Sequence, residues 1–174
     1  MPTIITAVIL LLITILLISG FVLLHKRKIA KRTKRRIDLL HTAAETYGLT
    51  FSAQEILENN LLGIDGIKQK LLIILFGTKE TVHIIPMKDV ATCILHKEYE
   101  KINVGTDKKE KIELRLRSID LLFSYKASPG TFTVCFYDSY VNHEFEKNAL
   151  ETKARQWEMM LTKMIVSKKS TVTI

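Results

Sequence analysis

The sequence predicts an α+β protein that begins with an N-terminal transmembrane helix, continues as a six- to seven-stranded antiparallel sheet and closes with a C-terminal amphipathic helix. Three observations predict this fold. An uncharged apolar run occupies Ile4–Leu24, short strand-like segments follow one another over Leu61–Asp138, and apolar residues recur at helical spacing from about Asn148 to Ile165. The 138 residues from 37 to 174 are enough for one domain with a hydrophobic core.

The apolar run predicts a membrane anchor over residues 1–24. Ile4–Leu24 has 21 residues without a charge, and 16 of them are Ile, Leu, Val or Phe. As a helix it would span about 31 Å, close to the thickness of a bilayer's hydrocarbon core. A cleaved secretory signal would need a positive n-region, a shorter apolar core and a small-residue cleavage site, which this sequence does not supply.

A basic segment, His25–Arg36, follows the run directly and contains eight Lys or Arg residues and no acid. The whole chain has 26 Lys and Arg against 18 Asp and Glu, so the part after Arg36 has 18 of each and is formally neutral. The positive-inside rule places this end of the helix in the cytoplasm. We expect a single-pass protein of the cell (inner) membrane, with its N-terminus outside and its C-terminal domain cytoplasmic.

Two compatible interpretations apply to these charges. They can orient the helix during insertion, or they can contact anionic headgroups at about 1 kcal/mol per basic residue. Because eight charges exceed what orientation needs, we expect membrane-surface contact by all of them: Lys26, Arg27, Lys28, Lys31, Arg32, Lys34, Arg35 and Arg36. Since the rest of the chain has no basic surplus, nucleic acid is not an expected partner.

A helix is predicted to lead from the basic segment to Gly48, giving a juxtamembrane region over 25–48. It could continue directly out of the membrane, because no Pro or Gly lies between Gly20 and Gly48. Ser52–Glu55 has the spacing of a capping box and predicts a single helical turn.

Strand signals dominate the next segment. Leu61–Asp65 and Lys70–Phe76 are predicted to form a hairpin through Gly66–Gln69. Further strands are predicted at Thr81–Ile85, Val90–Lys97, Lys111–Lys126 and Phe132–Phe136, with a loop over Val104–Lys109 and a turn at Ser128–Gly130.

In the segment Lys111–Lys126 the apolar residues move from even-numbered to odd-numbered positions. Its apolar residues fall on even positions up to Leu116 and on odd positions from Ile119 onward. Side chains alternate between the two faces of a strand, so an extra residue is needed to keep both sets on one face. We therefore predict a β-bulge or a short turn near Arg117-Ser118.

The closing helix is predicted from its apolar stripe, with Asn148 as its N-cap and Glu151 three residues later. The stripe consists of Leu150, Ala154, Trp157, Leu161 and Met164, widened by Met160 and Ile165. The folded domain is expected over 49–166, and Ser167–Ile174 is expected to be a flexible tail.

Several antiparallel strands followed by one helix with an inward Trp resemble the pleckstrin-homology-like superfold, a partly open barrel. The chain also resembles uncharacterised small bacterial single-pass membrane proteins, which share the Gly63-Ile64-Asp65 strand and the Ala154-x-x-Trp157 helix. The resemblance implies a cytoplasmic pleckstrin-homology-like domain and no particular activity. The inositol-lipid motif K-x(n)-[KR]-x-R is incomplete, because Lys68 and Lys70 lack the final Arg.

Motifs for catalysis or cofactor binding are absent from the sequence. The histidines have no metal-ligand spacing, and His143-Glu144 lacks the second His of H-E-x-x-H. Cys93 and Cys135 are most simply free thiols on strands, while Asp65 and Asp89 are most simply turn residues. No catalytic, cofactor-binding or metal-binding residue is predicted, and no cofactor.

These features favour a membrane-anchored binding or scaffolding module without enzymatic activity. Its partners would be a bilayer with anionic headgroups and another membrane-associated protein, which would meet an exposed strand edge or the groove between helix and sheet. The alternative is a membrane-tethered, hydrolase-like enzyme whose site is dispersed along the chain. The sequence identifies neither the partner nor the oligomeric state.

Overall fold

The computed structural model describes residues 2–103 and 112–167, without side chains for most of residues 2–25 and for 166–167. The chain divides into two compact units, 1–42 and 43–174, and each is described here by itself. The elements are α1 (Pro2–Thr46), β1 (Ala53–Ile56), β2 (Asn60–Asp65), β3 (Lys70–Phe76), β4 (Glu80–Pro86), the 3-10 helix η1 (Met87–Asp89), β5 (Val90–Asn103), β6 (Ile112–Tyr125), β7 (Thr131–Asp138), the 3-10 helix η2 (Glu144–Glu146) and α2 (Lys147–Ser167).

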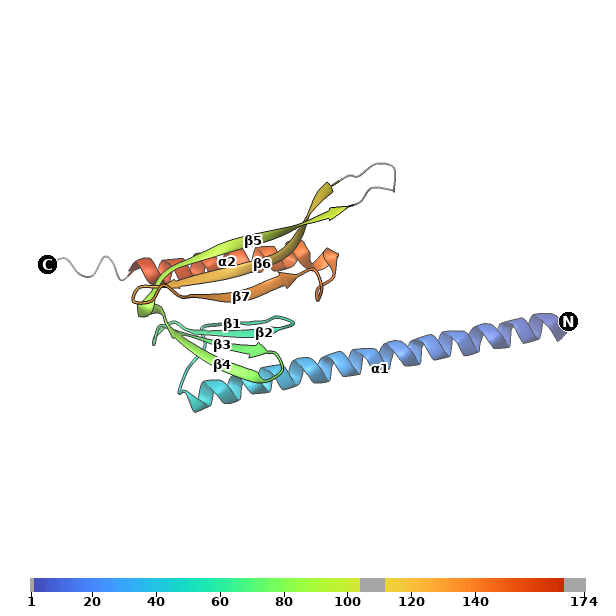
Figure 1. Ribbon diagram of the computed structural model, residues 1–174. Helices are drawn as coiled ribbons and strands as arrows, with labels where there is room; N and C mark the ends of the chain where they lie inside the picture. Colours follow the sequence, from blue (N-terminus) through green and yellow to red (C-terminus); the bar gives the residue numbers. More distant parts are fainter. Residues whose placement is uncertain (1, 104–111, 168–174) are drawn as a thin grey trace. The chain divides into compact units, whose positions relative to one another are not determined.

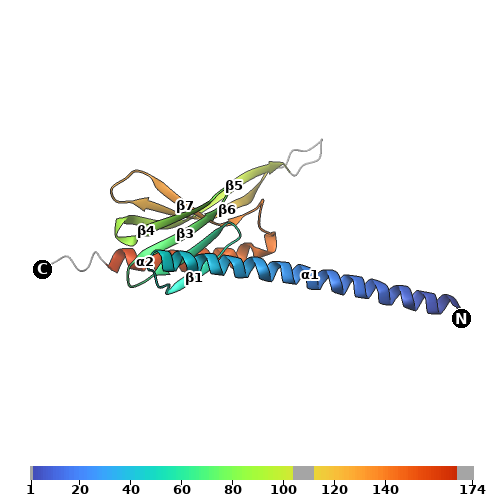
Figure 2. The ribbon, with the colours of Figure 1, turned by 90° about the horizontal axis from the view of Figure 1, so that it is seen from below.

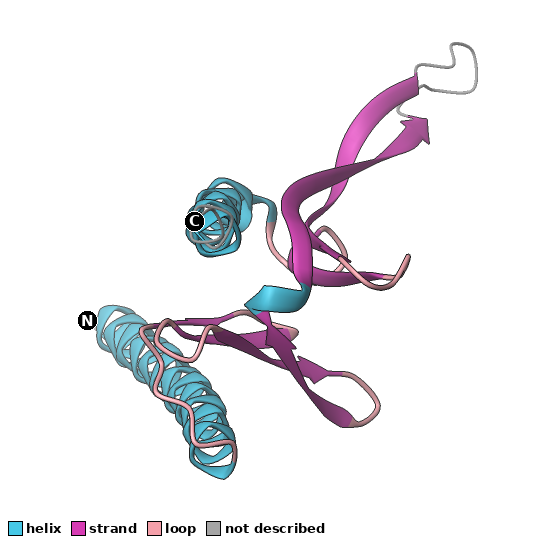
Figure 3. Ribbon diagram, turned by 90° about the vertical axis from the view of Figure 1, so that its left-hand side faces the viewer, coloured by secondary structure: helices cyan, strands magenta, loops and turns pink. Residues whose placement is uncertain are grey.

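The α+β class is confirmed, with two antiparallel sheets and a C-terminal helix (Figure 1). One sheet has the order β1-β2-β3-β4 and the other has the order β5-β6-β7. The expectation of six to seven strands is confirmed within the described residues, whereas the expected single sheet divides into two, and no barrel closes among these residues. Within the described residues the strands pair as two separate sheets, which η1 connects in sequence (Figure 3).

Helix α1 is continuous through the basic segment, as the lack of Pro and Gly after Gly20 allows. It ends where predicted, because Gly48 adopts a φ of +59° that residues with a Cβ rarely adopt. The Leu49 N–H donates to the Ala44 carbonyl at 2.7 Å, and the Lys68 ammonium donates to the Gly48 carbonyl. The first bond satisfies a carbonyl that the last turn of α1 would otherwise leave unpaired, and the second satisfies the carbonyl of the residue that ends the helix.

A search of the described residues finds no helix that is long and apolar enough to cross a membrane. Most side chains of Ile4–Leu24 lie outside the residues described in that detail. The transmembrane helix predicted from this run therefore stays a prediction.

The helical turn expected at Ser52–Glu55 is wrong, because Ala53–Ile56 forms strand β1. The Ser52 hydroxyl does not cap a helix. It donates to the Ile64 carbonyl at 3.0 Å, and the Ser52 N–H donates to the same oxygen at 2.8 Å. Pairing with β2 along four consecutive residues thus outweighs the local capping signal.

The hairpin of β2 and β3 is confirmed, with Asp65 paired to Lys70 across its turn. Strands β4 and β7 also lie where the sequence places them. Strand β5 extends to Asn103, six residues beyond the predicted end at Lys97, so that β5 and β6 run together past β7 (Figure 2). The loop predicted over 104–109 and the tail after Ser167 lie outside the described residues.

The predicted bulge in β6 is confirmed at Arg117. Glu98 pairs with Ser118 and the next residue, Tyr99, pairs with Leu116, which leaves Arg117 as the extra residue of β6. The extra residue places the even-numbered apolar residues before it and the odd-numbered ones after it on the same face of the strand.

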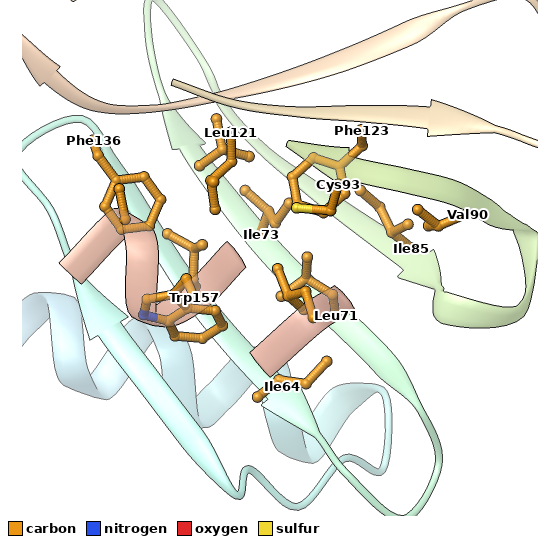
Figure 4. Close-up of a cluster of buried hydrophobic side chains, with 14 of the residues drawn as sticks. Ile64, Leu71, Ile73, Ile85, Val90, Cys93, Leu121, Phe123, Phe136 and Trp157 are labelled. Carbon is orange, nitrogen blue, oxygen red and sulfur yellow. The ribbon is translucent and has the colours of Figure 1, made fainter. Parts of the chain in front are cut away.

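Helix α2 and both sheets enclose one core, in which Trp157 is 5% exposed (Figure 4). Polar contacts fix α2 to each sheet. Lys153 pairs with Glu55 of β1 at 2.7 Å, and the Glu158 carboxylate accepts the Leu95 N–H of β5 at 2.7 Å. Between the sheets, the Asn60 side-chain amide donates to the Cys135 carbonyl at 2.6 Å. The inward position predicted for Trp157 is confirmed.

The start of α2 differs from the predicted Asn148 cap. The helix begins at Lys147 and follows η2 without a break. The cap lies upstream, where the His143 N–H donates to the Glu146 carboxylate at 2.9 Å and the Glu146 N–H donates to the His143 carbonyl at 3.0 Å. A glutamate three residues after the cap is the expected pairing, but the sequence contains two candidates at this spacing.

Gly63 in β2 is required by its neighbour. A Cβ at this position would lie 2.5 Å from the ring of Phe51, closer than such contacts occur. The tip of the Phe51 ring therefore occupies the space that a side chain at position 63 would take.

We expect Gly63→Ala to lower the free energy of unfolding of the full chain by about 1–3 kcal/mol, because the ring must move from its site. In a Phe51→Ala background the same substitution should cost less than about 0.5 kcal/mol. Urea unfolding of the four variants measures both effects. The control is Gly77→Ala, where the nearest atom is at 3.8 Å. An equal loss in both backgrounds would show that the ring is not the constraint.

Candidate functional site

The eight basic residues after the apolar run lie on α1. Seven of them are exposed and Arg36 is half-buried. At 3.6 residues per turn their positions are distributed around the whole helix, and the stretch from Lys26 to Arg36 is about 15 Å long. Together they form a cationic collar, by which we mean these eight residues, without an acidic residue among them.

A collar of this kind suits a layer of anions better than a single ligand. Its charges do not converge on one point, as the groups of a phosphate-binding pocket do, because they point in all directions from one axis. A headgroup layer surrounds a helix that crosses it and can meet every charge at once. The collar is the one predicted site of the sequence, and its contact with a membrane stays a prediction.

A second candidate is a cleft of about 460 Å³ in the domain. It is lined by Ile102 of β5, by residues 113–116 of β6, and by Glu144 and Lys147 where η2 meets α2. Carboxylates and cations alternate with apolar side chains around it, and its described lining contains no histidine. This composition suits a peptide segment, which offers polar backbone and apolar side chains, better than it suits acid–base chemistry on a small molecule.

Sequence reasoning missed this cleft. The segment Ile112–Leu116 alternates apolar and charged residues, a pattern that by itself predicts only a strand with one buried face. The cleft arises because β7 pairs with β6 only from Ser118 to Ser124, so the first part of β6 has no strand on that side among the described residues. The opposite charges of Glu113 and Arg115 are the feature of the sequence that could have indicated this cleft.

The described residues contain no group of three or more His, Cys, Asp or Glu arranged to hold a metal ion. His83 lies in β4 and His96 lies in β5. The His83 ring packs against Phe132 at 5.0 Å between centroids, and His143 stacks on Phe145 at 5.2 Å. His83 is half-buried and packs within the domain, while His143 and Phe145 are both exposed and stack at its surface.

Cys93 and Cys135 are free thiols on β5 and β7, as predicted. Burial raises the pKa of the Cys93 thiol to about 12, with a further contribution from the negative charge of Glu158. Burial also raises the pKa of Cys135, to which the charge of Asp120 adds. A nucleophilic cysteine needs a lowered pKa, so neither thiol is suited to act as a nucleophile.

Asp65 is a turn residue, as predicted, and it is 1% exposed. Its carboxylate accepts N–H groups from Thr50 at 2.8 Å, Ile67 at 3.0 Å and Lys68 at 2.7 Å. These backbone hydrogen bonds lower the pKa of Asp65, the bond from Thr50 most strongly, against the opposing effect of burial. Asp89, the other predicted turn residue, is exposed in η1.

Comparison of the chain with known protein families, curated proteins and solved structures gives no match. The two candidate sites therefore have to be interpreted from their own chemistry. The class that the described part defines is an α+β domain of two antiparallel sheets and a C-terminal helix.

We expect Asp65→Asn to reduce the free energy of unfolding by roughly 1–3 kcal/mol at pH 7, because it weakens the charge-assisted bonds that the buried carboxylate accepts from three backbone N–H groups. A carboxyl whose pKa is lowered by folding stabilises the fold above its usual pKa near 3.9, and this stabilisation is lost as the pH falls through the folded-state pKa. The difference between the variant and the parent should therefore shrink below about pH 4. Denaturant titrations from pH 7 to pH 3 measure it, with Asp89→Asn as the control; a difference that grows in acid would contradict the assignment.

Proposed function

We propose that the protein is a single-pass membrane protein whose cytoplasmic domain binds or scaffolds another protein at the membrane. The observation that supports this most directly is the position of the cationic collar. It follows a run of 21 uncharged residues within one continuous helix, α1. A collar adjoining an apolar run is what a helix needs where it leaves a bilayer on the cytoplasmic side.

The energetics favour an anchor over a peripheral contact. Sixteen Ile, Leu, Val and Phe residues favour insertion by on the order of 5–10 kcal/mol on a translocon scale. Eight basic residues near an anionic surface add about 1 kcal/mol each. Since insertion alone retains the chain, the collar would keep the domain close to the surface and would set the orientation, with the N-terminus outside.

For the domain we propose a pleckstrin-homology-like fold. In support, four strands, then three strands, then one helix follow in this order, and Trp157 of the helix is part of the core. Nineteen of the described residues are buried in this core cluster, and the cleft lies at a strand edge, where one of its lining residues, Leu116, packs against the cluster. An apolar interior with an accessible edge suits a binding module, in which an extended segment of a partner adds to the edge.

The enzyme alternative has less support. It would need a titratable pair converging in a cavity. The cleft lining offers Glu113 and Glu144 beside two cations, which can form ion pairs without performing proton transfer. No observation on the described residues favours a reaction class, so we propose the binding module alone.

Membrane topology tests the proposal. A reporter fused after Ile174 of the full chain should be active in its cytoplasmic form, and the chain should stay with the membrane fraction after extraction at alkaline pH. Replacing all eight residues of the collar by Gln should produce a mixed orientation, because the charge difference across the helix is lost.

The matched control replaces exposed lysines of the domain, Lys79, Lys88 and Lys163, by Gln and should leave the orientation unchanged. Release of the parent chain by alkaline extraction would refute the anchor. A reporter that is active only outside the cytoplasm would refute the orientation while leaving the anchor intact.

A further inference from the structure

The first part of β6 has an open edge, by which we mean the backbone of Ile112, Leu114 and Leu116 on the side of β7. Strand β7 pairs with Ser118–Ser124, and the Ser139 N–H reaches the Arg117 carbonyl at 2.9 Å. Beyond that point no described strand continues the sheet, and the cleft lies against residues 113–116. Strand β5 pairs with this part of β6 on its other side only.

Backbone alternation shows which groups face the open edge. The Leu95 N–H donates to Glu158 of α2, so the backbone groups of Leu95 point away from β6. Alternation along β5 gives Tyr99 the same direction. Its partner across the ladder is Leu116, whose own backbone groups must then point away from β5. The same follows for Leu114 and Ile112, two and four residues earlier.

The side chains of this segment are self-complementary. In an antiparallel pair of two copies centred on Leu114, Glu113 of each copy lies opposite Arg115 of the other, and Ile112 lies opposite Leu116. Opposite charges and apolar pairs directly across a ladder are both stabilising. A shift by one residue would place apolar side chains on the charged face and would lose both matches.

From this edge and its sequence we infer that the domain forms a two-fold symmetric dimer through antiparallel pairing of residues 112–116 of β6. Three residue pairs would exchange about six N–H···O bonds, because Leu114, Ile112 and Leu116 all face the open edge. The two contributing surfaces are identical, as a closed two-fold interface requires. The pairing joins two three-stranded sheets into one.

Exposure supports a second copy as the occupant. Ile112 is 65% exposed and Leu114 is 68% exposed, on the face that α2 covers further along β6. Pairing would bring Ile112 against Leu116 of the other copy and Leu114 against Leu114 of the other copy. Glu144 and Lys147 border the cleft and supply a polar rim with both signs of charge.

Among the other edge strands of the two sheets, β4 offers less for self-pairing. Its residues 80–86 contain one acid and no Lys or Arg, so no charge pair would fix the register of a self-paired β4. Proline at its end, Pro86, also lacks an N–H for pairing. The pairing through β6 goes beyond the proposed function, and it does not depend on whether residues 4–24 lie in a membrane.

A charge reversal tests the register. The full chain in detergent should be dimeric by light scattering, and either Glu113→Arg or Arg115→Glu should raise the dimer dissociation constant roughly tenfold, because two attractive pairs become repulsive. The double variant Glu113→Arg/Arg115→Glu exchanges the charges and should restore the parent value. Thermal unfolding of each variant checks that the domain remains folded.

Crosslinking tests the geometry independently. Leu114 would lie opposite its own copy with Cα atoms about 5.5 Å apart, within the range that a disulfide spans. Leu114→Cys should therefore form a disulfide-linked dimer under mild oxidation. The control is Ile67→Cys, at a position that is 92% exposed in the turn between β2 and β3, and it should form no disulfide-linked dimer. The native thiols contribute little background because burial raises the pKa of each.

Three outcomes would overturn the inference. The parent chain could be monomeric at micromolar concentration, the double reversal could fail to restore a dimer that the single reversals weaken, or Ile67→Cys could crosslink as fast as Leu114→Cys. A monomer whose cleft takes up a strand of a different protein would refute the dimer and leave the proposed binding function standing. If the chain is a dimer but alkaline extraction releases it from the membrane, the dimer stands and the proposed membrane anchor is refuted.

Discussion

The single extra residue of β6, Arg117, is the constraint on which the domain depends. Ile119, Leu121 and Phe123 are fully buried in the core, while Leu114 and Leu116 precede them with the opposite parity. Without the bulge, one of these two sets would point to the other face of the sheet. With it, a strand of 14 residues presents one continuous apolar face, of which α2 covers only the later part. The long β5–β6 hairpin and its uncovered end are both consequences.

Around this strand, buried polar groups decide how the other elements are placed. Asp65 draws three backbone N–H groups to the turn between β2 and β3, and one of them belongs to Thr50, just after α1. Asn60 binds a carbonyl of β7 and so connects the two sheets. Hydrogen bonds of this kind stabilise modestly when made, but a buried group left without its partner is costly. They specify the arrangement more than they add to its stability.

Local signals in the sequence predicted the elements well where the deciding interactions are local. The end of α1 at Gly48, the hairpin of β2 and β3, and the bulge of β6 all follow from residues close together in the chain. The errors arose where distant pairing decides. Ser52–Glu55 carries a capping signal but pairs with β2, and the split into two sheets depends on which strands become neighbours, which alternation alone does not encode.

The candidate sites differ in the same way. The cationic collar is a run of consecutive residues, so composition alone identifies it. The cleft combines residues 102, 113–116, 144 and 147, and it exists because β7 ends its pairing with β6 at Ser118. The residue pattern of β6 does not show where its pairing with β7 ends. The alternating charges of Glu113 and Arg115 gain a meaning only once that edge is known to be open.

The distribution of charge separates the roles of the two parts of the chain. After Arg36 the 18 basic and 18 acidic residues balance, so the domain has no net charge with which to attract a polyanion or an acidic surface. Its polar surface works through individual pairs, such as Lys97 with Glu151 at 2.8 Å and Lys153 with Glu55. A neutral domain whose charges act in pairs is suited to partners that match them residue by residue. A second copy of residues 112–116 that runs antiparallel to the first presents its charges in the reverse order, so that Glu113 of each copy meets Arg115 of the other. For this reason the sequence of β6 favours a second copy of the chain as its partner.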